Sequence, residues 1–265
     1  MLSAGGPPAD LEPTRRFSDR VADYVRSRPD YPAAAIDFVV GEAALPRGAT
    51  VVDVGSGTGL LARPFLEQGF GVIGVEPNGP MRAAGARELA GFPRFRSVGG
   101  RAEATGLAGG IAELVTAGQA FHWFDPAVAG RELGRVLRPA GRIALLWNER
   151  RTRETPFLEG YEALLERHCP EYRAVRRRYA RPEGLRATFG PGGWREERFD
   201  HEQAFGWEGL VSRVLSSSYT PREGDPGRGR LLSDLRTLFE AEAAAGRVRF
   251  LYDTRVYLGA PARAP

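Results

Sequence analysis

A glycine-rich loop between a short apolar run and a helix-forming run constrains the fold of this chain more than any other feature. Residues 51–59 read VVDVGSGTG, and the helix-forming run TGLLARPFLEQ follows over 58–68. Glycines let the backbone approach a ligand closely, and the first turn of a helix offers unpaired amides to an anionic group. The segment therefore predicts a strand, a ligand-binding turn and a helix.

Short apolar runs and helical runs keep alternating through the first 150 residues. This alternation predicts a parallel sheet whose crossover helices cover both faces. Asn78 and Asp125 are the side chains expected to cap two of the helices. We expect strands at 49–54, 71–75, 94–98, 113–117 and 142–147, and helices at 32–45, 58–68, 78–90 and 125–137.

The pattern changes after Asn148. We expect helices at 155–169, 207–217 and 231–245, and strands at 195–204 and 247–258. The predicted fold class is α/β, a doubly wound, mostly parallel sheet with a helical cap. The predicted organisation is a flexible tail over 1–13, a cofactor-binding core with an N-terminal lid over 14–150, a mainly helical substrate cap over 151–225, and a last helix and strand completing the core over 226–265.

Composition excludes several classes of site and partner. The single cysteine, Cys169, excludes an internal disulfide framework, and His122, His168 and His201 lack the spacing of metal ligands. We therefore expect no metal. No apolar run approaches the roughly 18 residues of a membrane span, and no secretory signal is visible, so we expect a cytoplasmic protein. All basic residues are arginines, scattered among acids at a net charge of +4, so we expect no nucleic-acid partner.

Glu76 is a carboxylate whose spacing from the glycine loop suits contact with the ribose of a bound nucleotide. Glu76 ends the second expected strand and follows Gly55 by 21 residues, the distance at which dinucleotide enzymes place an acid on the ribose. Those enzymes carry a third glycine where this chain has Leu60, and Asp53 would repel a pyrophosphate. A cationic sulfonium with an amino-acid group would tolerate Asp53. A nicotinamide-dependent oxidoreductase is therefore the disfavoured alternative.

Several blocks extend the likeness beyond the loop. DVGSGTG followed by VIGVEPN resembles the cofactor-binding motifs of class I S-adenosylmethionine-dependent methyltransferases. The similarity covers roughly residues 15–258 and points to the small-molecule branch of that family, which includes trans-aconitate methyltransferase-like and type 11 proteins. The further blocks are Phe17, Tyr24, RPDYP at 28–32, GRAE at 100–103, GQAFHWF at 118–124, LLWN at 145–148 and SSSY at 216–219.

The resemblance implies a seven-stranded Rossmann-like sheet with an antiparallel last strand, and S-adenosyl-L-methionine as cofactor, converted to S-adenosyl-L-homocysteine. Asp53 would lie near the ammonium group, Glu76 on the ribose hydroxyls, and Pro77 with Met81 against the adenine. The full set of cofactor-binding residues it implies is Arg28, Asp53, Gly55, Ser56, Gly57, Gly59, Glu76, Pro77, Met81, Ala102, Glu103, Gly118 and Gln119.

The sequence constrains the residues that bind the methyl acceptor less than it constrains those that bind the cofactor. His122 is the candidate general base, although methyl transfer to an ionised oxygen needs none, and the alternative is a wall residue with no proton role. Tyr31, Phe121, Trp123 and Tyr219 are the candidate substrate-binding residues, with core packing as the alternative for the aromatic cluster.

The predicted function is methylation of a small molecule, on a carboxylate or hydroxyl oxygen, by a monomer or homodimer. We expect Arg28 and the arginines at 150–153 to supply positive charge near an anionic or phenolic acceptor. A non-catalytic cofactor-binding protein is the alternative from another class. An RNA methyltransferase is disfavoured, because no RNA-binding module is recognisable.

Overall fold

The computed structural model describes residues 28–174, 182–217 and 219–262. The predicted tail and the first part of the predicted lid, including Phe17 and Tyr24, lie outside these ranges. No helix within them is long and apolar enough to cross a membrane.

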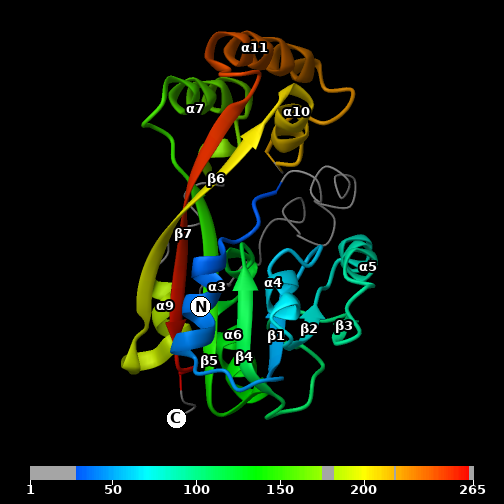
Figure 1. Cartoon of the computed structure of the whole chain (residues 1–265), viewed down its shortest axis with the longest axis vertical. Helices are drawn as coiled ribbons and strands as arrows, with labels where there is room; N and C mark the ends of the chain where they lie inside the picture. The colour runs from blue at the N-terminus through cyan, green and yellow to red at the C-terminus, as the bar shows by residue number, and fades with distance from the viewer. Residues whose placement is uncertain (1–27, 175–181, 218, 263–265) are drawn as a thin grey trace, which may run out of the picture.

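One mixed sheet organises the molecule (Figure 1). Its seven strands follow the order β3-β2-β1-β4-β5-β7-β6. The first five pair in parallel, and β7 runs antiparallel to both β5 and β6. This confirms the predicted α/β fold with a mostly parallel sheet. The strands are β1 (Thr50–Val54), β2 (Gly71–Val75), β3 (Phe95–Val98), β4 (Ala112–Gly118), β5 (Leu137–Arg150), β6 (Arg195–Phe205) and β7 (Val248–Gly259).

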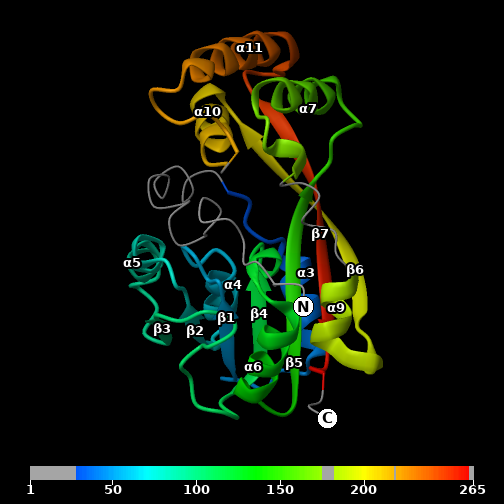
Figure 2. The same cartoon turned by 180° about the vertical axis from the view of Figure 1, so that it is seen from behind.

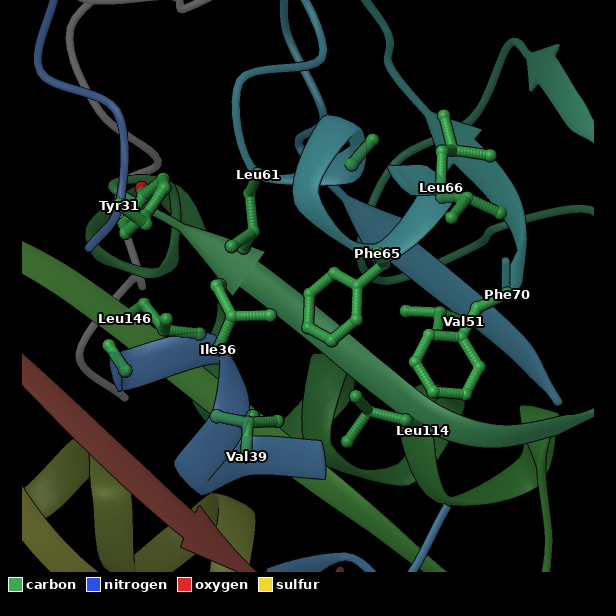
Figure 3. Close-up of a cluster of buried hydrophobic side chains, with 14 of the residues drawn as sticks. Tyr31, Ile36, Val39, Val51, Leu61, Phe65, Leu66, Phe70, Leu114 and Leu146 are labelled. Carbon is green, nitrogen blue, oxygen red and sulfur yellow. The ribbon is translucent and has the colours of Figure 1, made fainter. Parts of the chain in front are cut away.

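Helices cover both faces of the sheet (Figures 1 and 2). On one face, apolar side chains of α3 and α4 meet those of the strands; Figure 3 shows Ile36 and Phe65 beside Val51 and Leu114. The opposite face carries α6 and α9. The central strands are therefore buried on both sides, which explains their nearly continuous apolar sequence. The helices of this body are α3 (Ala33–Glu42), α4 (Ala62–Glu67), α5 (Gly79–Glu88), α6 (Pro126–Val136) and α9 (Pro182–Phe189).

Side-chain caps fix where three helices begin. Asn78 accepts from the Met81 amide at 3.0 Å, and Asp125 accepts from the amides of Ala127 and Val128. Thr155 does the same for α7 (Pro156–His168). Each satisfies amides that the first helical turn leaves unpaired, as the sequence predicts.

The helix after the glycine loop differs from the prediction. It begins at Ala62 instead of Thr58, because Gly59 holds a left-handed φ of 86° that a right-handed helix does not tolerate. No side chain caps it, and Leu61 stands at the cap position. The expected placement of the helix start directly on the glycine turn is therefore wrong.

A cap stands at the far end of β5, β6 and β7, above the body (Figure 1). It is built from α7, α10 (Trp207–Leu215) and α11 (Pro226–Glu242) on a third hydrophobic cluster. The α11 helix packs against α7 through Leu231, Leu235 and Phe239, spaced to share one helix face. It belongs to the cap, whereas the sequence assigned it to the core. Conversely, α9 packs on α6 in the body.

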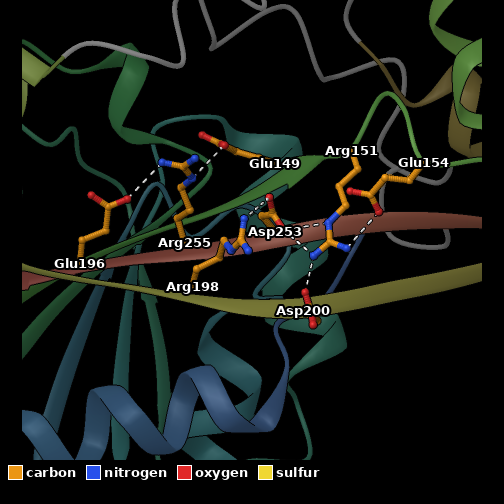
Figure 4. Close-up of polar contacts among 8 residues, drawn as sticks. All are labelled: Glu149, Arg151, Glu154, Glu196, Arg198, Asp200, Asp253 and Arg255. Atoms are coloured by element: carbon orange, nitrogen blue, oxygen red, sulfur yellow. Dashed lines mark hydrogen bonds and ion pairs between the residues drawn. The ribbon is translucent and has the colours of Figure 1, made fainter.

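Ion pairs link β5, β6 and β7, the three strands that carry the cap (Figure 4). Arg151 lies between Asp253, at 2.6 Å, and the carboxylates of Asp200 and Glu154. Arg255 pairs with acids on both neighbouring strands, Glu149 on β5 and Glu196 on β6. Networks of this kind hold neighbouring strands in register more effectively than isolated surface pairs do. Arg151, one of the arginines expected to lie near the acceptor, thus joins the strands that support the cap.

The cap core depends on Phe250. Its fully buried ring meets Tyr161 at 4.8 Å and Phe157 at 5.2 Å between ring centroids. Phe250→Ala is expected to lower the free energy of unfolding by about 3–5 kcal/mol, because it removes a buried ring and leaves a cavity. Urea unfolding measures this change. Arg249→Ala, at the exposed neighbouring position, is the control; equal losses in the two variants would contradict the assignment.

Candidate functional site

The candidate site lies at the carboxyl end of β1, where the order in which the strands are added to the sheet reverses. Strand β1 pairs with β2 on one side and β4 on the other, so helices leave toward opposite faces at its carboxyl end. Open α/β sheets bind ligands at such points. Two adjoining pockets occupy this edge and share Gly55, Gly57, Gly118 and Gln119 in their walls.

The first, here called the Asp53 pocket, is lined by polar oxygens. Three of them are buried without a hydrogen-bond partner among the described residues: Asp53 Oδ2, Thr58 Oγ1 and Gln119 Oε1. Buried polar atoms in folded proteins are almost always paired. Three unpaired oxygens in one small pocket therefore indicate a ligand group rich in N–H donors, such as an ammonium.

Burial sets the charge of Asp53. Its other oxygen, Oδ1, accepts a hydrogen bond from Thr116 Oγ1 at 2.9 Å. Burial raises the pKa of this carboxyl to about 7, the Thr116 hydrogen bond opposes the rise, and the nearby Glu76 charge adds to it. A cationic ligand beside Oδ2 would favour the ionised form.

The second, here called the Glu76 pocket, joins one carboxylate to apolar walls. Glu76 is buried, and its two oxygens accept from the amides of Gly57 at 2.9 Å and Asn78 at 2.8 Å. Burial raises its pKa, and the two backbone hydrogen bonds oppose the rise. Each oxygen keeps a further lone pair, which suits hydroxyl donors such as a ribose diol. Apolar and aromatic walls come from Pro77, Met81, Ala102, Trp123 and Phe124.

The glycines of the loop have different roles. Gly55 and Gly57 line both pockets with left-handed φ values of 69° and 55°. Gly59 lines neither; a Cβ there would lie 2.5 Å from Leu89 Cδ1. It allows close packing between the loop and the Leu89 side chain that follows α5, outside the two pockets where the other predicted cofactor-binding glycines of the loop lie.

An asparagine fastens the segment before α3 over the sheet edge. Asn148 Nδ2 donates to the Asp30 carbonyl at 2.8 Å, while Thr254 Oγ1 donates to Asn148 Oδ1 at 2.6 Å. Tyr31 is thereby held against the end of β4, where a Cβ on Gly118 would lie 2.3 Å from its hydroxyl. This segment forms one wall of the Asp53 pocket.

Most of the predicted site residues meet in these two pockets. Arg28, Tyr31 and Ser56 line the Asp53 pocket, as does Asp53, and Gly55, Gly57, Gly118 and Gln119 line both. The Glu76 pocket gathers Glu76, Pro77, Met81, Ala102, Glu103 and Trp123. In the described ranges no group of three or more His, Cys, Asp or Glu side chains is placed to hold a metal.

Three predicted acceptor-side residues lie elsewhere. Phe121 belongs to the hydrophobic core beneath the sheet edge, edge-on to Trp147 at 6.0 Å, because the short 3-10 turn at 121–123 directs it inward. His122 lines neither pocket; its ring packs on Trp123 at 4.8 Å. Tyr219 packs on Tyr172 in the cap cluster.

Sequence reasoning missed several wall residues. Asn78 lines the Glu76 pocket besides capping α5, and Leu60 and Leu61 line the Asp53 pocket. The leucines read as ordinary apolar residues of a helix, so their sequence carries no signal. Gln119 adopts a left-handed φ of 52°, which is unusual for a residue other than glycine, and nothing in the sequence predicts this conformation.

The part of the chain that supplies most of the pocket residues is similar to known proteins. Residues 52–145 match the family described as a methyltransferase domain. An uncharacterized methyltransferase of Mycobacterium tuberculosis is 40% identical over 138 residues, 51% of this chain and 52% of that protein. One from Schizosaccharomyces pombe is 34% identical over 154 residues, 58% of this chain and 60% of that protein. The match spans about half the length of these curated relatives.

Solved structures share the fold. A protein from Anaeromyxobacter dehalogenans, described as a type II methyltransferase, superposes with a TM-score of 0.60 at 23% identity, covering 89% of this chain and 99% of that one. Phosphoethanolamine N-methyltransferase 2 of Haemonchus contortus, in complex with S-adenosyl-L-methionine, gives 0.57 at 13% identity, covering 97% and 61%. At these identities the likeness shows the fold.

The two glycine roles are separable by substitution. Gly59→Ala is expected to lower the free energy of unfolding by about 1–3 kcal/mol, because alanine meets both an unfavourable φ and Leu89. Gly57→Ala places its Cβ 3.4 Å from the flexible end of Met81, in the Glu76 pocket. We expect it to weaken S-adenosylhomocysteine binding more and folding less. Urea unfolding and calorimetry of both variants measure this; identical behaviour would refute the distinction.

Ligand binding should depend on the ionisation of Asp53. With a pKa of about 7, the carboxyl is mostly neutral at pH 6 and mostly ionised at pH 8. A ligand cation that needs the ionised form should therefore bind about tenfold more weakly at pH 6 than at pH 8. Calorimetry with S-adenosylhomocysteine across this range tests it, with Asp53→Asn as the control that lacks the step. A wild-type profile matching that of Asp53→Asn would contradict the role of Asp53.

Proposed function

We propose that this chain, which carries a class I S-adenosylmethionine-dependent methyltransferase domain, transfers a methyl group from that cofactor to a small molecule. The observation that carries the proposal is the pair of complementary pockets. The oxygens of Asp53, Thr58 and Gln119 that have no partner among the described residues suit an amino-acid ammonium, and Glu76 with its apolar surroundings suits an adenosine. A pyrophosphate would instead meet the Asp53 carboxylate.

The residues present fit the cofactor along its whole length. Asp53, Thr58 and Gln119 would hold the amino-acid end, and Glu76 the ribose hydroxyls. Met81 and Trp123 would flank the adenine. Between these ends the backbone of Gly55, Gly57 and Gly118 leaves room for a close approach. When bound, the cofactor supplies an electrophilic methyl group attached to a sulfonium.

Catalysis by this chain would consist mainly of alignment. Tyr31 and Gln119 both line the Asp53 pocket at the end of β4, and Gln119 also lines the Glu76 pocket. They would direct the acceptor onto the methyl group from the side of the Asp53 pocket. Positioning of two reactants supplies roughly 7–11 kcal/mol of barrier reduction in favourable cases. His122 faces neither pocket, so no proton transfer through it is required.

The acceptor we propose is a small molecule that reacts through a carboxylate or hydroxyl oxygen. Its space is bounded by the Arg28–Tyr31 segment, which Arg28 ties to the cap by donating to the Ser216 carbonyl at 3.0 Å. This covering segment favours an acceptor that fits inside the chain, handled by a monomer or a homodimer of independent sites.

Methyl transfer is tested with S-adenosylmethionine that carries a radioactive methyl group. We expect label to enter at least one member of a panel of carboxylic acids, phenols and amines, and the expected product class is an ester or ether. Binding of the cofactor without transfer to any acceptor would favour the non-catalytic alternative. Label in intact RNA or protein alone would overturn the small-acceptor proposal, and tight binding of NAD would overturn the whole assignment.

Glu76 provides the binding prediction. Glu76→Ala should weaken S-adenosylhomocysteine binding by about 1.5–3 kcal/mol, roughly 10–150-fold, because a charged acceptor is lost from the ribose. Glu76→Gln keeps one acceptor for the Gly57 or Asn78 amide and should lose less. Glu88→Ala, at an exposed acid on α5, is the matched control. Calorimetry measures all three, and wild-type affinity in a folded Glu76→Ala protein would exclude the ribose contact.

A further inference from the structure

Two arginines are buried together inside the cap. Arg150, at the end of β5, has a side chain 10% exposed, and Arg213, on α10, is 6% exposed. Around them stand the aromatic rings of the cap core, with Tyr161 and Phe250 in contact with the guanidinium groups. Arginines are rarely this buried unless an opposite charge accompanies them.

Arg150 has such a partner. Its Nη2 donates to Glu162 Oε2 at 2.5 Å and to the Tyr172 hydroxyl at 2.8 Å. Its guanidinium also lies over the Tyr161 ring at 4.7 Å. The charge of Arg150 is therefore balanced within the cap by Glu162, whose Oε2 also accepts a hydrogen bond from the Tyr172 hydroxyl.

Arg213 has no such partner among the described residues. Its Nε reaches the Tyr252 hydroxyl at 3.4 Å, and its Nη1 reaches Ser217 Oγ at 3.3 Å. Both hydrogen bonds are long, both acceptors are neutral, and a guanidinium has five donors. Its guanidinium also lies 5.8 Å from the centroid of the Phe250 ring.

An unbalanced buried charge destabilises the protein that contains it. Removing a cation from water costs more than two long bonds to hydroxyls return. An apolar side chain of similar volume would pack the cap core equally well without the cost of burying a charge. A buried arginine in this setting is explained if an anion joins it during function.

Arg213 is connected to the Asp53 pocket by a short chain of hydrogen bonds. The Tyr252 hydroxyl donates to Gln203 Oε1 at 3.1 Å, and Gln203 Nε2 donates to the Arg28 carbonyl at 3.3 Å. Arg28 lines the Asp53 pocket and reaches back to the Ser216 carbonyl, beside Ser217. Tyr252 and Gln203 thus link the guanidinium of Arg213, in the cap, to Arg28 in the wall of the pocket.

We propose that the guanidinium of Arg213 binds an oxyanion of the methyl acceptor, a carboxylate or a phosphate that is not the reacting oxygen. The inference rests on the proposed function, because it assigns the cap side of the same site. Tyr219, a predicted substrate-binding residue, packs on the same hydrophobic cluster of the cap as Phe250 and Tyr252. The planar guanidinium pairs with two oxygens at once, so it orients the acceptor as well as attracting it.

Thermal unfolding of the protein saturated with S-adenosylhomocysteine tests the proposal. The probes are succinate and inorganic phosphate, with succinamide as the uncharged analogue and sodium chloride at equal ionic strength. We expect succinate or phosphate to raise the Tm where the two controls do not. A shift with succinate identifies a carboxylate acceptor, and one with phosphate a phosphate ester. No anion-specific shift in the wild-type protein would overturn the proposal.

Two variants locate the effect. Arg213→Met should raise the anion concentration for half-maximal stabilisation at least tenfold, and its Tm without anion should equal or exceed that of wild type. Arg236→Met, at an exposed cap arginine paired with Glu240, should behave like wild type. An unchanged anion response in Arg213→Met refutes the proposal.

If Arg213→Met does not fold, Arg213→Lys keeps the charge and loses the two-pronged geometry, so a weaker anion response is expected and an unchanged one refutes the site. Calorimetry with S-adenosylhomocysteine is run on each protein. Failure of the wild type to bind it would sink the proposed function, whereas loss of the anion response alone would sink only the role of Arg213.

Discussion

The carboxylate of Asp53 is buried near the carboxyl end of β1, with Oδ1 hydrogen-bonded to Thr116 and Oδ2 without a hydrogen-bond partner among the described residues. The free-energy cost of burying this oxygen unpaired is the constraint on which the rest of the site depends. Within the same described ranges, Thr58 and Gln119 add two more oxygens without a partner to this pocket. A fold seldom keeps such groups unless a ligand completes them, and the ligand that completes three oxygens carries donors and positive charge.

The cap contains a buried group of the opposite charge, a cation. The long strands β5, β6 and β7 place α7, α10 and α11 away from the body, and inside the cap the guanidinium of Arg213 has no carboxylate partner in the part of the chain that the structure describes. Arg28 connects the two regions, because it lines the Asp53 pocket and contacts Ser216 and Gln203 near Arg213. A cationic cofactor below and an anionic acceptor above would satisfy both, and each would favour approach of the other.

Local sequence signals predicted much of this arrangement. The alternation of apolar and helical runs specified the sheet, and Asn78, Asp125 and Thr155 marked helix starts. The spacing from Gly55 to Glu76 placed two halves of the site on neighbouring strands. These features depend on residues close together in the chain, so the sequence displays them directly.

Tertiary contacts decided the rest. Gly59 resembles a ligand-binding glycine, and only the approach of Leu89 reveals its packing role. The apolar stripe of α11 fits a core helix or a cap helix equally well, and its partner α7 settles the matter. Arg213 reads as an ordinary helix residue, because its burial depends on Phe250 and Tyr252, distant in the chain.

A crystal structure of the protein with S-adenosylhomocysteine tests the central claim most directly. The account predicts the ligand's amino group within hydrogen-bond distance of Asp53 Oδ2 and its ribose hydroxyls on Glu76, with the adenine between Met81 and Trp123. A ligand seated elsewhere, or one that leaves Asp53 Oδ2 without a partner, would contradict it.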